Sequence, residues 1–152
     1  MKNYKITAKT LEGLEEVLAG EIRNIGGKNI MAGKRAVDFE GDMGMIYRAN
    51  YYLRTALRIF RQIESFTFTD IDDFYLRCLK IRWESFLNVN DSFSIQSTVF
   101  HSPLFRNSMF ASLKVKDAIA DRFRQKHGRR PDVDTKTPDI QFQVHISNDK
   151  CT

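Results

Sequence analysis

The chain has little cysteine, little proline and no long apolar run, and these shortages exclude several classes of protein. Only Cys78 and Cys151 occur among 152 residues, too few for a disulfide-stapled fold and without the paired spacing of a thiolate zinc site. No apolar run approaches the roughly 18 residues of a membrane span, and the first residues lack the apolar stretch of a secretory signal. We therefore expect a cytoplasmic protein with no membrane partner.

Helix and strand patterns predict an α+β fold in two parts. In the first 65 residues, short strands at residues 4–7, 28–31 and 36–40 accompany one helix from about Leu11 to Ile25 and another from Met45 to Leu57. The pair Gly26-Gly27 ends the first helix, because glycine accepts the left-handed dihedrals of a helix C-terminus. The β-branched and aromatic stretch at residues 59–68 predicts one continuous strand.

The second part contains the clearest helix of the chain. Residues up to Lys80 predict a helix that Thr69 or Asp70 can cap, and the alternation over residues 93–99 predicts a half-buried strand. Apolar residues at helical spacing predict a helix over residues 108–126, with glycine at its C-terminal cap. A strand at residues 140–147 leads into a hairpin turn two residues before the end. We expect this strand to keep an unpaired edge, because its returning partner is cut short.

Positive charge is concentrated in one segment. The chain has 24 Lys and Arg against 19 Asp and Glu, a net charge of +5, while residues 101–131 alone hold eight basic and two acidic side chains. This local excess is typical of proteins that bind a phosphate backbone, although a solvated helix face gives the same count. The basic residues of the segment are Arg106, Lys114, Lys116, Arg122, Arg124, Lys126, Arg129 and Arg130.

The sequence gives no indication of a catalytic residue, a metal or a cofactor site. His101, His127 and His145 lie far apart, without the spacing of metal-ligating histidines. The acidic stretch at residues 132–139 lacks the glycine and terminal glutamate of a calcium loop, and we interpret it as a turn. Glycine-rich phosphate-binding and dinucleotide-binding patterns are also missing.

Aromatic residues beside the basic ones favour RNA as a ligand, since Phe, Arg and Lys together can stack on unpaired bases and neutralise phosphates. Most phenylalanines are core residues by default, and we expect Phe105 to reach a base because it lies in a predicted loop. Asn107 and Ser108 begin the predicted helix, where they can bind a phosphate or cap the helix. The predicted RNA-binding residues are Phe105, Arg106, Asn107, Ser108, Lys114, Lys116, Arg129 and Arg130.

Several blocks of the sequence resemble the THUMP domain of bacterial RNA methyltransferases, and most closely that of the 23S rRNA guanine-N2-methyltransferases. An opening segment resembles the ferredoxin-like part that precedes THUMP in these enzymes. The THUMP-like blocks are residues 105–108, 113–119, 130–134 and 138–140, and the opening blocks are residues 10–15 and 37–42. The resemblance implies a small ferredoxin-like domain at residues 1–65 and a THUMP domain of α/β type at residues 66–152, truncated before its last strand.

The resemblance also implies a function. A chain of this family would position structured rRNA, 23S rRNA in the most similar group, for guanine-N2 methylation by a C-terminal domain that uses S-adenosylmethionine. The cofactor-binding fold of that domain and its Asn-Pro-Pro-Tyr type of motif have no counterpart here. We therefore expect the chain by itself to bind no S-adenosylmethionine and not to methylate, with RNA and its own methyltransferase domain as partners.

Two other functions stay open at the level of the sequence. The basic helix could dock on an acidic partner such as a ribosomal protein, in which case partner binding would not depend on RNA. A freestanding enzyme would need His101, His145 and the loop at residues 132–139 to converge on one site, and a metal or substrate would then shift its melting temperature.

Overall fold

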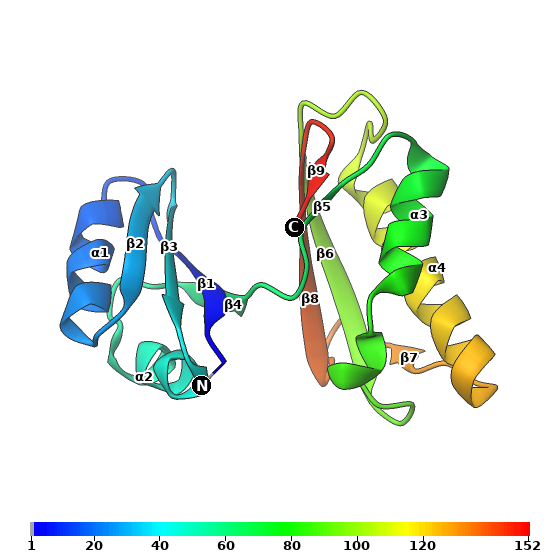
Figure 1. Cartoon of the computed structure of the whole chain (residues 1–152), viewed down its shortest axis with the longest axis horizontal. Helices are drawn as coiled ribbons and strands as arrows, with labels where there is room; N and C mark the ends of the chain where they lie inside the picture. The colour runs from blue at the N-terminus through cyan, green and yellow to red at the C-terminus, as the bar shows by residue number, and fades with distance from the viewer. Residues whose placement is uncertain (1) are drawn as a thin grey trace. The chain divides into compact units, whose positions relative to one another are not determined.

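The computed structural model describes residues 2–152, which form two compact units. The first, the N-terminal unit, ends at Ile63, and the second, the C-terminal unit, comprises Glu64–Thr152. The division falls two residues before the predicted boundary at residue 65. In each unit the helices cover one face of a β-sheet (Figure 1).

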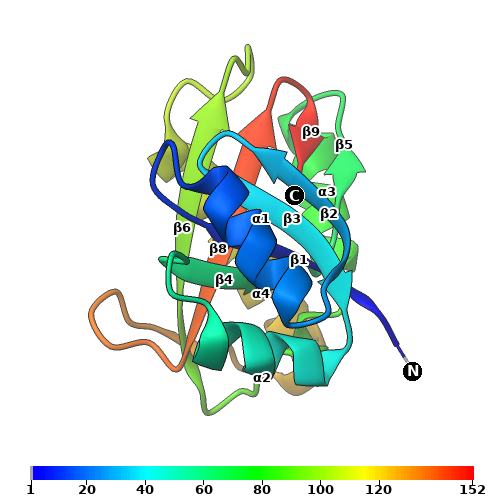
Figure 2. The same ribbon diagram turned by 90° about the vertical axis from the view of Figure 1, so that its left-hand side faces the viewer.

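The N-terminal unit has the element order of a ferredoxin-like fold, β-α-β-β-α-β. Its four strands form an antiparallel sheet in the order β2-β3-β1-β4, and Figure 2 shows both helices in front of that sheet. Ten buried residues between helices and sheet form the core of the unit, Phe39 and Ile22 among them. The elements are β1 (Tyr4–Lys9), α1 (Glu15–Asn24), β2 (Lys28–Gly33), β3 (Ala36–Gly41), α2 (Met43–Tyr52) and β4 (Arg58–Arg61).

Helix α1 ends at the predicted glycine pair. Gly26 has a φ of +90°, and the amides of Gly26 and Gly27 donate to the carbonyls of Arg23 and Ile22. These bonds satisfy carbonyl groups that the last turn of a helix leaves without partners. The predicted terminator of α1 is therefore confirmed.

Helix α2 is shorter than predicted. It ends at Tyr52, because Leu53 adopts an extended conformation, whereas the apolar spacing predicted helix as far as Leu57. The amides of Arg54 and Thr55 donate to the carboxylate of Glu21 on α1, and the hydroxyl of Thr55 donates to it as well. A carboxylate from a distant part of the sequence thus replaces the carbonyl partners that a longer helix would have supplied.

The single strand predicted over residues 59–68 is wrong. Two separate strands occupy this stretch: β4 pairs with β1 in the N-terminal unit, while β5 (Phe66–Thr67) pairs with β9 (Lys150–Cys151) in the C-terminal unit. Residues 62–65 connect the two units. β-Propensity is similar on both sides of this connection, so composition could not show that the two halves belong to different sheets.

The C-terminal unit holds a five-stranded sheet in the order β5-β9-β8-β6-β7, with β6 parallel to β7 and β8. Helices α3 and α4 lie on the same face of this sheet (Figure 1). None of the helices within residues 2–152 is long and apolar enough to cross a membrane. Besides β5 and β9, the elements are α3 (Ile71–Lys80), η1 (Trp83–Ser85), β6 (Ser92–Phe100), α4 (Ser108–His127), β7 (Asp132–Val133) and β8 (Ile140–Ser147).

The chain ends in the predicted hairpin. Asn148, with a φ of +55°, and Asp149 form a two-residue turn that places Ser147 opposite Lys150. His145 and Thr152 then exchange two backbone hydrogen bonds of 2.9 Å each. One edge of β8 is therefore paired over residues 145–147, and the expectation of a wholly unpaired edge is corrected for this part of the strand.

Candidate nucleic-acid interface

Helix α4 is the element on which most of the predicted RNA-binding residues lie. It is 20 residues long, begins at Ser108 as predicted, and ends at Gly128, which adopts the left-handed conformation of a C-cap. Ala111, Val115 and Ala118 are buried against the rest of the unit. They fix which side of the helix faces solvent, because successive residues are rotated by about 100°.

The N-terminus of α4 borders an open hollow beside the end of β6. The hollow has a volume of about 580 Å³ and is lined by residues 97–102 of β6 and the following turn and by residues 105–108. Arg106, Asn107 and Ser108 are exposed at its rim. The first amides of a helix lack intrahelical partners and lie at its positive end, so an anion in this hollow would be attracted to them.

Asn107 has the capping role that the sequence left open. Its side-chain Oδ1 accepts a hydrogen bond of 2.8 Å from the amide of Phe110, which satisfies one of the free amides of the first turn. The side-chain amide group of Asn107 is still a donor on the exposed side of the cap. Asn107 thus holds the helix terminus in place and can contact a ligand only through that group.

The prediction that Phe105 reaches a base is wrong in this structure. Only 1% of Phe105 is exposed, and its ring lies 4.7 Å from the ring of Phe74 and 5.7 Å from that of Phe68, centre to centre. Edge-to-face packing of this kind is typical of an aromatic core. A loop position does not imply an exposed side chain, and here the loop directs the Phe105 ring into the core.

Two other phenylalanines are exposed where Phe105 is not. Phe100 ends β6 with half of its surface exposed, and Phe110 is 36% exposed on the first turn of α4. A helical wheel based on Ala111, Val115 and Ala118 places Phe110 about 100° from the buried side, on the flank of the helix, where its ring centre lies 5.8 Å from that of Phe105. Met109 and Leu113 are exposed on the same helix and add apolar surface beside the hollow.

Arg106 and Lys114 are the cations nearest to this N-terminal region of α4. Neither forms an ion pair with any of the residues that the structure describes, and the Lys114 ammonium lies 5.6 Å from the centre of the Phe110 ring. No Asp or Glu occurs between Asp91 and Asp117 in the sequence. The hollow is thus bordered by positive and aromatic side chains, with no carboxylate on the segments that form it.

Lys116 lies on a different side of α4 from Lys114. It lies two residues beyond Lys114, a rotation of about 200° around the helix axis, and its ammonium is 3.1 Å from the carboxylate of Asp117. The two lysines thus flank the buried side of α4 from opposite directions. The sequence had predicted them as a pair.

Part of the positive charge of α4 is used within the protein. The guanidinium of Arg122 and the ammonium of Lys126 both donate to the carboxylate of Glu84 on η1, and these bonds hold the pKa of Glu84 well below its usual range while that of Arg122 is raised. Arg124 lies 3.5 Å from Asp121. The eight basic residues of the segment therefore overstate the charge available to a ligand.

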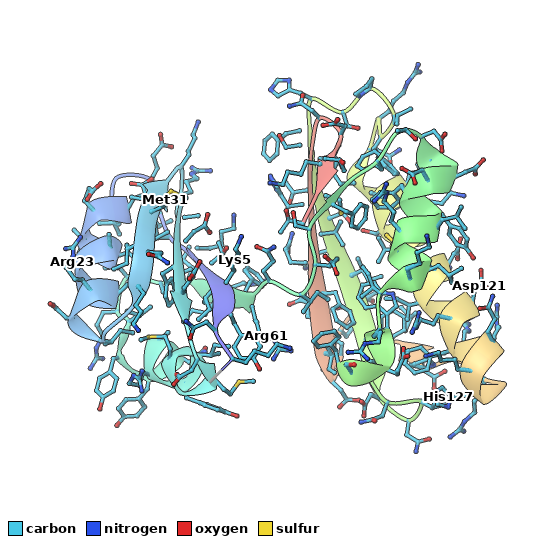
Figure 3. All side chains as sticks on the ribbon, in the orientation of Figure 1. Lys5, Arg23, Met31, Arg61, Asp121 and His127 are labelled. Atoms are coloured by element: carbon cyan, nitrogen blue, oxygen red, sulfur yellow. The ribbon has the colours of Figure 1, made fainter. Side chains whose placement is uncertain are left out.

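Arg129 and Arg130 lie at the other end of α4, beyond His127, which Figure 3 labels at the C-terminal end of the helix. A helix of 20 residues is about 30 Å long, so these arginines are about that far from Arg106. Arg129 donates a hydrogen bond to the side chain of Asn90, and both residues are exposed. The predicted basic residues therefore do not form one surface. Some lie near the N-terminal end of α4, and Arg129 and Arg130 lie beyond its C-terminal end.

The acidic stretch after Arg130 begins with the short strand β7, which was not predicted, and continues as the predicted loop. A carboxylate oxygen of Asp134 accepts from the amides of Lys136 and Thr137, which lowers the pKa of Asp134, and Asp139 accepts from the amide and hydroxyl of Ser92. Both carboxylates are thus engaged in positioning the backbone. Within residues 2–152, no group of three or more His, Cys, Asp or Glu side chains could hold a metal ion.

Comparison with known proteins agrees with this architecture. The THUMP domain model matches residues 68–152, and the RlmL ferredoxin-like domain model matches residues 5–60. The chain belongs to the THUMP domain family. Its two units correspond to the two matched regions, so the expected α+β fold of a ferredoxin-like domain followed by a THUMP domain is confirmed.

Relatives of this THUMP protein include ribosomal RNA large subunit methyltransferases K/L. The chain is 32% identical over 149 residues to that of Desulfotalea psychrophila and 36% identical over 144 residues to that of Buchnera aphidicola, covering 98% and 95% of this chain. It spans about a fifth of the length of these relatives, 21% and 20%.

A solved structure shows the same fold over the whole chain. A protein from Listeria monocytogenes, described as a predicted N6-adenine-specific DNA methylase, superposes with a TM-score of 0.84 at 26% identity. The match covers 99% of this chain and 39% of that protein.

Proposed function

We propose that this chain is the RNA-binding module of a large-subunit rRNA methyltransferase, and that it positions structured 23S rRNA for guanine-N2 methylation in the cytoplasm. The observation that carries this proposal is the hollow at the N-terminus of α4, with Arg106 at its rim, Lys114 further along the same helix and no carboxylate on the segments that form the hollow. Unpaired cations, free helix amides and exposed aromatic rings together suit a phosphate backbone with accessible bases.

The methyl transfer itself is assigned to a domain outside these 152 residues. The sheet of the N-terminal unit is entirely antiparallel, and the sheet of the C-terminal unit is mixed, with helices on one face only. Doubly wound parallel sheets, which bind nucleotide-like cofactors at the carboxyl ends of their strands, have helices on both faces. The residues present therefore do not fit S-adenosylmethionine, and the role proposed for this chain is to bind and orient the RNA.

The test is a titration followed by fluorescence anisotropy. The chain is added to a structured 23S rRNA fragment, to a single-stranded RNA and to duplex DNA of equal charge, at several salt concentrations. The proposal predicts the tightest binding to the structured RNA and a steep decrease in affinity with salt, because each phosphate contact contributes about 0.7 to 0.9 to the log–log slope. Equal, weak binding to all three ligands would contradict it.

A further inference from the structure

Helix α2 of the N-terminal unit exposes three tyrosine rings to solvent. Tyr47, Tyr51 and Tyr52 are 71%, 78% and 56% exposed, whereas Met45 and Ala49 of the same helix are buried. Aromatic side chains of this size bury large areas when they belong to a core. None of the three belongs to the hydrophobic core of the unit. We call these three rings the tyrosine face.

The geometry of α2 gathers the rings on one side. Tyr47 and Tyr51 are four residues apart and therefore neighbours on the helix surface, directed away from Ala49. The rings of Tyr51 and Tyr52 meet edge to face, with centres 4.9 Å apart. Gly44, one turn before Arg48, has no side chain to cover this part of the helix. The Tyr51–Tyr52 pair and the Tyr47 ring are thus all open to solvent on one helix.

The sequence segment that carries the tyrosine face is rich in arginine. From Met43 to Ile63 the sequence contains four arginines and no Asp or Glu. Arg48 lies on the same helix, with its guanidinium 4.0 Å from Asp42 at the start of α2, so it is held beside the rings by a long ion pair only. The four arginines are Arg48, Arg54, Arg58 and Arg61.

We propose that the tyrosine face of α2 is a second RNA-contacting surface, on which unpaired bases stack while neighbouring arginines contact the backbone. This inference rests on the RNA-binding function proposed above and adds a site in the other unit of the chain. Exposed rings present π-faces that accept any base, and the net positive charge of this segment attracts phosphate, although Asp42 lies near Arg48 and the Glu21 carboxylate accepts from the amides of Arg54 and Thr55. An acidic protein would use the arginines but would not need three solvent-exposed rings in one patch, which favours RNA as the occupant.

The test compares two triple variants of the whole chain in binding to an unstructured single-stranded RNA. Replacing all three tyrosines by alanine removes the rings, while Tyr47→Phe, Tyr51→Phe and Tyr52→Phe together keep them. Stacking on an aromatic ring is worth about 1–3 kcal/mol per base, so the alanine variant is expected to bind at least about fivefold more weakly, and the phenylalanine variant to bind like the wild type. Met31→Ala is the matched control, since Met31 is 68% exposed on β2 of the same unit (Figure 3).

A second readout locates the contact. Single-stranded RNA that carries a photoreactive uridine is expected to cross-link to α2 in the wild type and to lose that cross-link in the alanine variant. Unchanged affinity of the alanine variant, an equal loss in the phenylalanine variant, or cross-links confined to the C-terminal unit would each overturn the tyrosine site. Those results would leave the proposed function intact so long as RNA still binds through α4, whereas a wild-type chain that binds no RNA would overturn both.

Discussion

Arg122 and Glu84 form a bidentate ion pair that ties helix α4 to η1. Nε and Nη2 of Arg122 donate to the two carboxylate oxygens of Glu84 over 2.7 Å each, and Nη1 donates to the carbonyl of Leu79 at 2.9 Å. Each of the three guanidinium nitrogens therefore has an acceptor, and the side chains of the pair are only partly exposed. Arg122 is among the basic residues of the segment that could bind RNA. In the structure its charge instead stabilises the fold of the C-terminal unit.

Replacing Glu84 by glutamine is expected to destabilise the C-terminal unit by about 1.5–3 kcal/mol at neutral pH, the range for hydrogen bonds to charged groups. The pKa of Glu84 is lowered in the folded protein, so its contribution is complete above the unfolded value of 4.5 and is lost as pH falls through the folded value. Urea denaturation should therefore show a difference between wild type and Glu84→Gln that narrows below pH 4.5. The exposed Asp132→Asn is the control, and an equal effect of both substitutions would contradict the assignment.

Tyr75 is expected to ionise at a higher pH than a tyrosine without a carboxylate partner. Its hydroxyl donates a hydrogen bond of 2.5 Å to Asp121, labelled in Figure 3, and this bond raises the pKa of Tyr75 to about 12. The protonated phenol is favoured in the folded state, so its stabilising contribution is present below pH 10 and is lost as pH rises toward 12. An alkaline titration of tyrosinate absorbance should show one late step that disappears in Tyr75→Phe. A Tyr75→Phe titration curve that keeps the step near pH 12 would contradict this prediction.

Arg106 and Lys114 are expected to account for much of the salt dependence of RNA binding. The double variant Arg106→Ala with Lys114→Ala should reduce the slope of log affinity against log salt by about 0.7 to 0.9 for each phosphate that is no longer neutralised. Arg124→Ala is the control, because Arg124 is exposed but lies beside Asp121. A folded double variant with the wild-type slope would remove the N-terminal end of α4 from the interface.

Arg129 and Arg130 are expected to matter only for RNA long enough to reach both ends of α4, which are about 30 Å apart. Joint replacement of the two arginines by alanine should weaken binding of a long stem and leave a short hairpin unaffected. Affinity measurements on both RNAs, each with wild-type protein as reference, test the separation. If the variant has the wild-type salt slope on the long stem, these arginines do not contact phosphate.

Phe105 and Phe100 are expected to respond in opposite ways to replacement by alanine. Phe105→Ala removes a fully buried ring and should cost about 3–5 kcal/mol of stability. Phe100→Ala removes a half-exposed ring, which should change stability little and weaken binding of RNA with unpaired bases. Thermal melting and RNA titration separate the two effects. A Phe105→Ala protein as stable as the wild type would contradict the core assignment.

Much of the fold could be predicted because its signals are local. Asp70 caps α3, Asn107 caps α4, and Gly128 ends α4 in the left-handed conformation, all within a few residues of the periodic segments that they bound. The hairpin at Asn148 is equally local. Each of these signals involves a backbone group and a residue close to it in sequence. They can therefore be recognised without knowledge of the tertiary structure.

The errors concern partners that are distant in sequence. Glu21 accepts the amides that follow α2 from 33 and 34 residues away, and Glu84 pairs with Arg122 across 38 residues. Local patterns could not show that these carboxylates shorten a helix or neutralise two cations. The same holds for Phe105, whose burial depends on Phe68 and Phe74 from another part of the unit.

The most direct test of the account is an NMR titration of the isotopically labelled chain with a structured 23S rRNA fragment. The account predicts the largest amide shift changes in residues 97–108 and in the first turns of α4, near Arg106 and Lys114, with further changes on α2 if bases stack on its tyrosines. Residues around the Arg122–Glu84 ion pair should change little. Shift changes confined to other surfaces, or none at RNA concentrations well above those of the protein, would contradict the assignment of this chain as an RNA-binding module.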